Sequence, residues 1–183
     1  MKKEMDSLLK ELYPLCRSIT GNGVRETLNI LKKHIPLKVF EVRSGKKVFD
    51  WNIPPEWNIK DAWVKDSKGK KIIDFKKSNL HILNYSVPIK KKVFLKELKD
   101  HLYTLESHSS WIPYRTSYYQ KRWGFCMAHN DFKKLKEETY EVFIDSKLKK
   151  GSLTYGELFV KGRKKEEVLL TCYTCHPSMC NDN

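Results

Sequence analysis

Apolar residues recur at helical spacing in the first part of the chain. Between residues 3 and 18 they share one helical face, and they are Met5, Leu8, Leu9, Leu12, Leu15 and Cys16. We therefore expect a helix over 3–18 whose apolar stripe faces a core. The Gly21-Asn22-Gly23 turn should end this segment. A second amphipathic helix should follow over 24–35, ending before Pro36, and the pattern then predicts a strand over 37–42.

The pattern changes at about residue 46, where short extended runs and turns replace long amphipathic segments. Runs at 62–64 and 72–75 flank Ser67-Lys68-Gly69-Lys70, which is typical of a hairpin. Further predicted elements are strands at 80–87 and 140–144 and helices at 94–105 and 131–137.

The last part of the chain predicts a second hairpin. Its strands are expected at 152–160 and 168–173, joined by a turn at 161–164. The second strand is almost continuously apolar, which is typical of a strand covered on both faces in the central sheet of an α/β protein. The predicted fold is α/β (α+β within these residues), with a β-rich module at 46–149 inserted into an outer frame formed by 1–45 and 150–183.

The chain is strongly basic, with 36 Lys and Arg against 22 Asp and Glu and a net charge of +14. The lysines are spread in short groups and no nucleic-acid motif accompanies them, which favours solvated surface over a nucleic-acid partner. No apolar run approaches the ~20 residues needed to cross a bilayer, and no signal-peptide segment follows the start. We expect a soluble cytoplasmic protein without a membrane partner.

Three of the five cysteines lie close to the end of the chain. The odd count and the absent export signal argue against a disulfide framework. Cys172-Tyr173-Thr174-Cys175-His176 fits the C-x-x-C-H pattern of c-type haem attachment, but that chemistry requires export. A thiolate zinc site using Cys172, Cys175, Cys180 and His176 has suitable ligand types, although a zinc knuckle needs a second ligand pair.

A third interpretation uses nitrogen and oxygen ligands. His176 stands where the predicted buried strand ends, and Asp182 follows on the connecting loop. Sites in open α/β sheets form at the carboxyl ends of strands, and an imidazole with a bridging carboxylate suits a dizinc hydrolase. From these two residues alone, the alternative stays open that His176 is a structural histidine and Asp182 an ordinary loop residue.

Short motifs that follow one another in order along most of the chain indicate a resemblance to a known family. They are Leu15-Cys16-Arg17-Ser18-Ile19-Thr20-Gly21, Gly23-Val24-Arg25-Glu26-Thr27-Leu28, Phe49-Asp50-Trp51, Pro55-Glu56-Trp57-Asn58-Ile59, Asn84-Tyr85-Ser86, Ile112-Pro113-Tyr114, Thr116-Ser117-Tyr118-Tyr119, Trp123-Gly124-Phe125-Cys126, Gly151-Ser152-Leu153-Thr154-Tyr155-Gly156-Glu157, Cys175-His176-Pro177-Ser178 and Asn181-Asp182-Asn183. With these motifs the chain resembles the DUF4910 aminopeptidase-like family, with a nested DUF2172 module, over about residues 8–183.

The resemblance implies an M28-like zinc-peptidase fold and an aminopeptidase reaction linked to surface-polysaccharide biosynthesis. His176 then matches the first zinc-ligand histidine and Asp182 the carboxylate that bridges two zinc ions. Pro177 and Asn183 would shape the loop, and Ser178 stands where classical M28 enzymes have the Asp of an H-x-D motif. The general base and the remaining ligands are expected beyond Asn183.

The expected protein is therefore an N-terminal fragment of a zinc-dependent aminopeptidase-like enzyme. The full-length form would hold one or two zinc ions and act on a peptide or aminoacyl-type small substrate. This chain alone would bind metal weakly or not at all and would be inactive, since it lacks a general base. The alternative is a non-catalytic module that binds a peptide, glycan or protein partner through the β-rich insertion, although its aromatic side chains are interpreted mainly as core.

Overall fold

The computed structural model describes residues 2–178, which form two compact units. Unit 1 comprises residues 1–56 and 149–183, and unit 2 comprises residues 57–148. The first division lies downstream of the boundary predicted at residue 46, and the second lies next to the boundary predicted at 149. That residues 46–149 are an inserted module stays a prediction.

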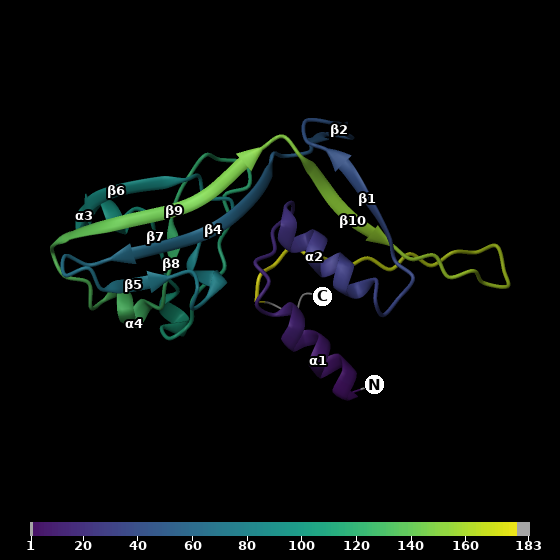
Figure 1. The fold of residues 1–183 in the computed structure, drawn as a ribbon, viewed down its shortest axis with the longest axis horizontal. Coiled ribbons are helices and arrows are strands. Elements are labelled where there is room, and N and C mark those ends of the chain that lie inside the picture. Colours follow the sequence, from purple (N-terminus) through teal and green to yellow (C-terminus); the bar gives the residue numbers. More distant parts are fainter. Residues whose placement is uncertain (1, 179–183) are drawn as a thin grey trace. The chain divides into compact units, whose positions relative to one another are not determined.

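Unit 1 is built from two helices and a two-stranded ribbon (Figure 1). Helix α1 spans Lys2–Leu12 and helix α2 spans Asn22–Leu31. Strand β1 (Lys38–Arg43) pairs antiparallel with β10 (Ser152–Glu157), so two distant parts of the sequence form one ribbon. The short strands β2 (Lys47–Val48) and β3 (Trp51–Asn52) form a small hairpin. The strand predicted over 37–42 is thus present.

Helix α1 differs from its prediction in length and in burial. It ends at Leu12 rather than at residue 18, because Pro14 disfavours the helical conformation at the residue before it and cannot donate a backbone hydrogen bond. No residue of α1 is buried, and Met5 and Leu9 are 60% and 49% exposed. The prediction that this stripe faces a core is wrong for the described residues.

Helix α2 supplies most of the apolar core of unit 1. Of the predicted stripe Val24, Leu28, Leu31 and Ile35, the first two are buried, Leu31 is half-buried and Ile35 is exposed. Ile30 is buried as well. A Cβ at Gly23 would lie 2.2 Å from the backbone oxygen of Cys16, so only glycine permits this close approach of the preceding loop. The helix stops at Leu31, and turns occupy the next residues up to Pro36.

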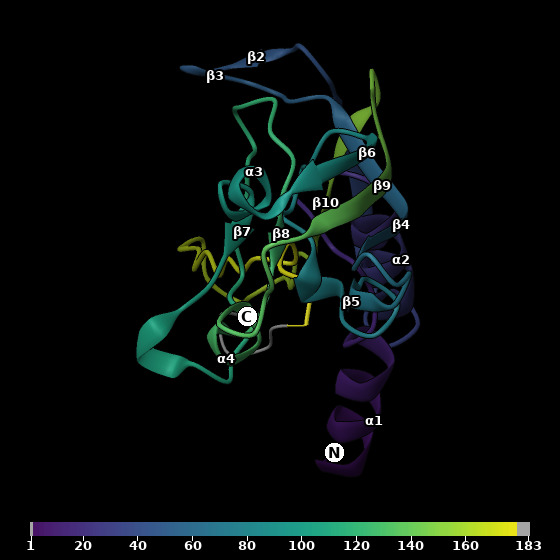
Figure 2. The same ribbon diagram turned by 90° about the vertical axis from the view of Figure 1, so that its left-hand side faces the viewer.

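Unit 2 is organised around a four-stranded sheet with the order β5-β4-β9-β6 (Figures 1 and 2). The strands are β4 (Glu56–Lys65), β5 (Lys71–Asp74), β6 (Ile89–Phe94) and β9 (Thr139–Lys149). The predicted hairpin around 67–70 is confirmed by the antiparallel pairing of β4 with β5. Strand β9 alternates between buried and half-buried positions, as expected for a sheet with one face on a core.

Shorter elements complete unit 2. They are the 3-10 turns η1 (Asn79–His81) and η2 (Glu106–His108), helices α3 (Leu95–Lys99) and α4 (His129–Phe132), and the parallel pair β7 (Leu102–Tyr103) and β8 (Phe125–Cys126). The core contains Trp57, Tyr85, Phe125, Tyr140, Leu98 and Ile144, each at most 2% exposed.

Three predictions in this unit are wrong in detail. No strand spans 80–87, because Tyr85 has a left-handed backbone (φ 70°) and the segment forms only isolated bridges. The helix predicted at 94–105 ends at Lys99, and its last part becomes β7, which pairs with β8. The helix predicted at 131–137 is α4, which lies earlier and has no side-chain cap from Asn130.

The predicted hairpin over 152–173 does not form among the described residues. Strand β10 pairs with β1 instead, and residues 158–176 have no regular secondary structure. Val168, Leu169 and Leu170 are 87%, 86% and 90% exposed. An apolar strand needs both a neighbour for its backbone and a covering layer for its side chains, and the described residues supply neither here.

The mixed α/β class is confirmed by helices together with several small sheets. Within residues 2–178, none of the helices combines the length and the apolar character that a bilayer crossing requires.

Candidate functional site

The segment that leads to His176 returns toward the helices of unit 1 (Figure 1). The backbone oxygen of His176 accepts a hydrogen bond of 2.8 Å from Nε of Arg17. A second nitrogen of Arg17, Nη1, donates to the backbone oxygen of Leu12 at 2.8 Å. Arg17 is 4% exposed and therefore ties the end of α1 to the loop at His176. Arg17 was not predicted as a site residue, although it stands in the ordered motif Leu15-Cys16-Arg17-Ser18-Ile19-Thr20-Gly21.

Two more contacts fix this loop. The hydroxyl of Ser178 donates to the backbone oxygen of Tyr13 at 3.4 Å, and Pro177 is buried. Ser178 has a left-handed backbone (φ 50°), which is uncommon for a residue with a side chain. The rings of Tyr173 and His176 lie 6.2 Å apart between centroids and are tilted by 47°. The loop is thus held by hydrogen bonds at residue 176 itself and at residue 178.

The structure describes only one member of the predicted metal pair. His176 is half-buried, whereas Asp182, Asn183 and Cys180 lie outside the described residues. Within residues 2–178, no three His, Cys, Asp or Glu side chains are grouped so that they could hold a metal ion. The described residues by themselves therefore do not fit a zinc centre, and no reaction step can be derived through one.

Cys16 and Cys126 do not provide a nucleophile. Burial raises the pKa of Cys16 to about 12 and that of Cys126 to about 12, so both thiols stay protonated at neutral pH. Cys172 is exposed and Cys175 is half-buried, and neither is in a disulfide.

Several of the other histidines make ordinary structural contacts. Nδ1 of His81 lies 2.8 Å from the backbone oxygen of Cys126, and burial lowers the pKa of this imidazole. His101 stacks on Trp123 with 3.5 Å between ring centroids. Nδ1 of His129 lies 3.0 Å from the hydroxyl of Thr104. These side chains support the fold of unit 2.

A charged cluster in unit 1 was not predicted from the sequence. Arg25 of α2 binds Glu41 of β1 at 2.8 Å and Glu56 at 2.6 Å. Glu56 is 4% exposed and also accepts a hydrogen bond from the backbone of Ser152 at 3.3 Å. A Cβ at Gly151 would lie 2.4 Å from Oε2 of Glu56, so glycine is required beside this carboxylate. Four of these five residues stand in the ordered motifs, and Glu41 is the exception. Their presence in the motifs was the only signal in the sequence.

This cluster is structural rather than acid–base machinery. The hydrogen bond to Glu56 raises the pKa of Arg25, and the hydrogen bond from Arg25 holds the pKa of Glu41 below its usual range. Arg25 and Glu41 therefore stay charged at neutral pH. Loss of Arg25 would take the closest counter-charge from the buried carboxylate of Glu56, which is unfavourable. The pair therefore stabilises the packing of α2 against Glu56.

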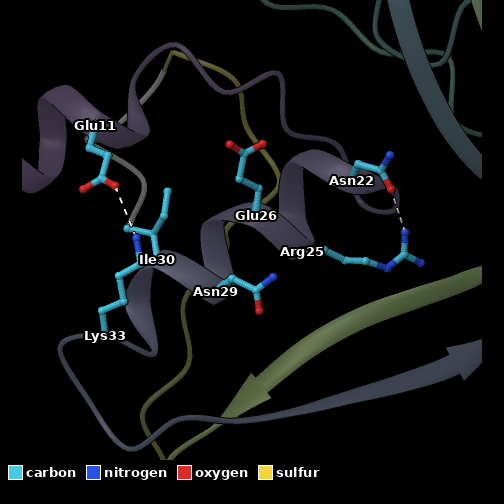
Figure 3. Close-up of a pocket in the computed structure, with 7 residues that line it drawn as sticks. All are labelled: Glu11, Asn22, Arg25, Glu26, Asn29, Ile30 and Lys33. Atoms are coloured by element: carbon cyan, nitrogen blue, oxygen red, sulfur yellow. Dashed lines mark hydrogen bonds and ion pairs between the residues drawn. The ribbon is translucent and has the colours of Figure 1, made fainter.

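A pocket of about 440 Å³ opens between α1 and α2 in unit 1 (Figure 3). It is lined by Glu11, Asn22, Arg25, Glu26, Asn29, Ile30 and Lys33. Glu11 and Lys33 approach to 3.9 Å across it, and Arg25 turns toward Asn22 and the ribbon strands. Of its charged lining residues, Glu11 pairs with Lys33 and Arg25 belongs to the Arg25 cluster, which leaves the exposed Glu26 as the remaining acid of the pocket.

Comparison with known proteins adds the family. Residues 56–147, half of the chain, match the family described as a domain of unknown function, DUF2172. The chain belongs to the DUF2172 family. The matched range covers nearly all of unit 2.

Relatives extend the similarity over unit 1 as well. A protein from Clostridium acetobutylicum is 59% identical over 180 residues, and it is described provisionally as a polysaccharide biosynthesis protein with an aminopeptidase-like domain. A crystal structure from the same organism, assigned provisionally as a peptidase, is 58% identical, covers 99% of the chain and superposes with a TM-score of 0.94. The DUF2172 chain spans 42% of the length of the first protein and 43% of the second.

Proposed function

We propose that this DUF2172 chain forms part of a zinc-dependent aminopeptidase-like protein of the DUF4910 type, with an M28-like fold. The peptidase-like kind is supported by the Clostridium relatives, which match nearly the whole chain. The observation that carries the proposal is the position of His176, at the end of an apolar segment that has no covering layer among the described residues.

In the proposed site, His176 and Asp182 are two of the ligands of one or two zinc ions. Zinc would supply Lewis-acid polarisation of the scissile carbonyl and a water of lowered pKa. The role of the chain's own residues is positional. Arg17 holds the backbone of residue 176 at 2.8 Å and thereby limits the directions that the imidazole can take.

One histidine and one aspartate cannot complete a dizinc centre, and amide hydrolysis needs a general base near the attacking water. We therefore propose that the 183 residues alone have little or no activity. The whole protein would act in the cytoplasm on a peptide or aminoacyl-type small substrate in polysaccharide biosynthesis.

Zinc binding tests this proposal without relying on turnover. A full-length protein that contains these residues and its His176→Ala variant are titrated with zinc against a chromophoric chelator. His34→Ala serves as the matched control, because His34 is an exposed histidine of the same unit. Loss of one ligand should weaken zinc binding about tenfold or more in His176→Ala and leave the control unchanged. Equal affinities of His176→Ala and wild type would remove His176 from the ligand set.

Activity is measured separately, as hydrolysis of aminoacyl-p-nitroanilides with added zinc. The 183-residue chain should be inactive, whereas a full-length protein that contains these residues should be active and should lose activity with His176→Ala. An active 183-residue chain would contradict the proposed incompleteness of the site.

A further inference from the structure

Unit 2 contains a pocket that none of the proposed peptidase chemistry uses. It has a volume of about 320 Å³, at the small end of the range for ligand sites. Its lining residues are Leu83, Tyr103, Arg115, Thr116, Ser117, Tyr118, Tyr119, Gln120 and Arg122. Most of them come from one loop, 115–122, that precedes strand β8.

Backbone hydrogen bonds hold this loop in place at both ends. The amide of Asn84 donates to the backbone oxygen of Arg115 at 2.9 Å, and the amide of Ser117 donates back to the oxygen of Asn84 at 2.9 Å. The amide of Val87 donates to the oxygen of Arg122 at 2.9 Å. Since Asn84 is fully buried, the loop is anchored on the core of unit 2 rather than on solvated surface.

A residue with an unusual backbone conformation, Tyr85, contacts one of the residues that line the pocket. Tyr85 adopts φ 70° although it is bulky, and it is 2% exposed. Its ring stacks on Trp57 at 5.8 Å and meets the edge of Tyr118 at 5.2 Å. Left-handed backbone in a bulky residue persists only where the surroundings enforce it, and such residues cluster at ligand sites. The ring of Tyr85 thus packs against Tyr118, which lines the pocket.

The charge of the pocket has one sign. Arg115 and Arg122 are its only charged lining residues and both are exposed. Across residues 2–178, no carboxylate comes within ion-pair distance of either guanidinium. Two arginines on one small pocket without an internal counter-charge are suited to an external anion, because the guanidinium fork binds carboxylate or phosphate with two hydrogen bonds.

The remaining lining residues indicate what accompanies the anion. Tyr103, Tyr118 and Leu83 offer apolar faces, against which a flat ring can pack. Thr116 and Gln120 are exposed and offer a neutral hydroxyl and an amide group, which suit the hydroxyls of a sugar. The volume holds about one ring and not a nucleic-acid strand, which needs a groove several nucleotides long.

We propose that this pocket of the DUF2172 unit binds an anionic monosaccharide unit, with its carboxylate or phosphate on Arg115 and Arg122 and its ring against Tyr118. The site is independent of the metal ligands and of any hydrolytic activity. It gives unit 2 a recognition role even where the chain does not catalyse a reaction.

Calorimetric titration of the 183-residue chain tests the proposal with defined probes. Glucuronate and glucose 1-phosphate carry the anion on a sugar, glucose lacks the anion, and acetate and inorganic phosphate lack the ring. At least one anionic sugar should bind about tenfold or more tightly than both glucose and its own free anion. Whichever of the two binds more tightly identifies the anion as carboxylate or phosphate.

Variants separate this site from general basic charge. Arg115→Gln and Arg122→Gln should each weaken the tighter sugar about tenfold or more, since each removes a charge-assisted bond. Lys121→Gln makes the same charge change at a neighbouring exposed residue that does not line the pocket, and it should change affinity less than about twofold at ~0.15 M salt. Thermal unfolding of each variant reports whether it is folded.

Three results would overturn the proposal. One is the absence of binding by either anionic sugar up to about 10 mM, which is weaker than specific sites require. A second is binding of a free anion as tightly as the sugar that carries it, which would show that the sugar ring contributes no affinity. The third is an equal loss of affinity in Lys121→Gln and the arginine variants, which reduces binding to net charge.

Discussion

Units 1 and 2 are almost equal in length but bury their apolar residues to very different extents. Of the 20 buried apolar side chains among the described residues, 16 belong to unit 2 and four to unit 1. Of the 18 large apolar side chains that are exposed, 14 belong to unit 1 and four to unit 2. Unit 2 therefore has a core of its own, whereas the apolar pattern of unit 1 is left largely without a covering layer.

The difference shows that an amphipathic pattern alone does not produce a core. Helix α1 has an amphipathic pattern and residues 168–173 form an apolar run, yet neither contains a buried residue. What holds unit 1 together instead is α2, the β1–β10 ribbon and the Arg25 cluster. Four experiments test this contrast.

Proteolysis should show the largest difference. Chymotrypsin should first cut within 158–173, where Phe159, Leu169 and Leu170 are at least 76% exposed, on the order of a hundredfold faster than within unit 2. Mass spectrometry of early fragments identifies the sites. First cuts inside 57–148 would reverse the contrast between the units.

A matched pair of leucine truncations should differ strongly in stability. Leu98 is fully buried in unit 2, whereas Leu170 is 90% exposed in unit 1. Leu98→Ala should lower the free energy of unfolding by about 2–5 kcal/mol through a cavity and lost burial. Leu170→Ala should change it by less than about 0.5 kcal/mol. Urea unfolding followed by tryptophan fluorescence measures both, and a comparable loss in Leu170→Ala would show that this segment is buried in solution.

A glycine pair tests the tightly packed contact between Gly151 and Glu56 in unit 1. Gly151→Ala places a methyl 2.4 Å from Oε2 of Glu56 and should cost about 1–3 kcal/mol, because the buried carboxylate must move away from Arg25. Gly162→Ala is the control, since the nearest atom would be 4.0 Å away. Thermal unfolding followed by circular dichroism compares them, and equal midpoints would show that the Glu56 contact is loose.

The smallest effect is a pH dependence located in unit 2. Burial lowers the pKa of His81 in the folded chain, so the unfolded chain binds more protons below the ordinary value of 6.5. The stabilisation is present above that value and is lost as the pH falls. Unfolding midpoints should therefore drop between about pH 7.5 and about pH 5.5. His81→Asn keeps a donor for the Cys126 oxygen but cannot titrate, so it should show a smaller drop; identical drops would exclude His81.

Local patterns identified much of the fold correctly. Helix α2, strands β1 and β9 and the β4–β5 hairpin follow from periodicity and turn residues, because neighbouring residues alone set these preferences. The position of His176 after an apolar run, also a local feature, made it a candidate ligand, and the family resemblance assigned it that role. The structure describes His176 but not Asp182, so the pair stays a prediction.

Other features depend on partners that are distant in the chain. The pairing of β10 with β1, the exposure of residues 168–170 and the shortening of the predicted 94–105 helix each depend on which segments meet in space. The same holds for the Arg25 cluster, whose members come from separate stretches of sequence, and for the pocket of unit 2, where Leu83 and Tyr103 meet the loop 115–122. Periodicity tells which side chains can be buried, but burial itself requires a surface that covers them, and only tertiary structure supplies that surface.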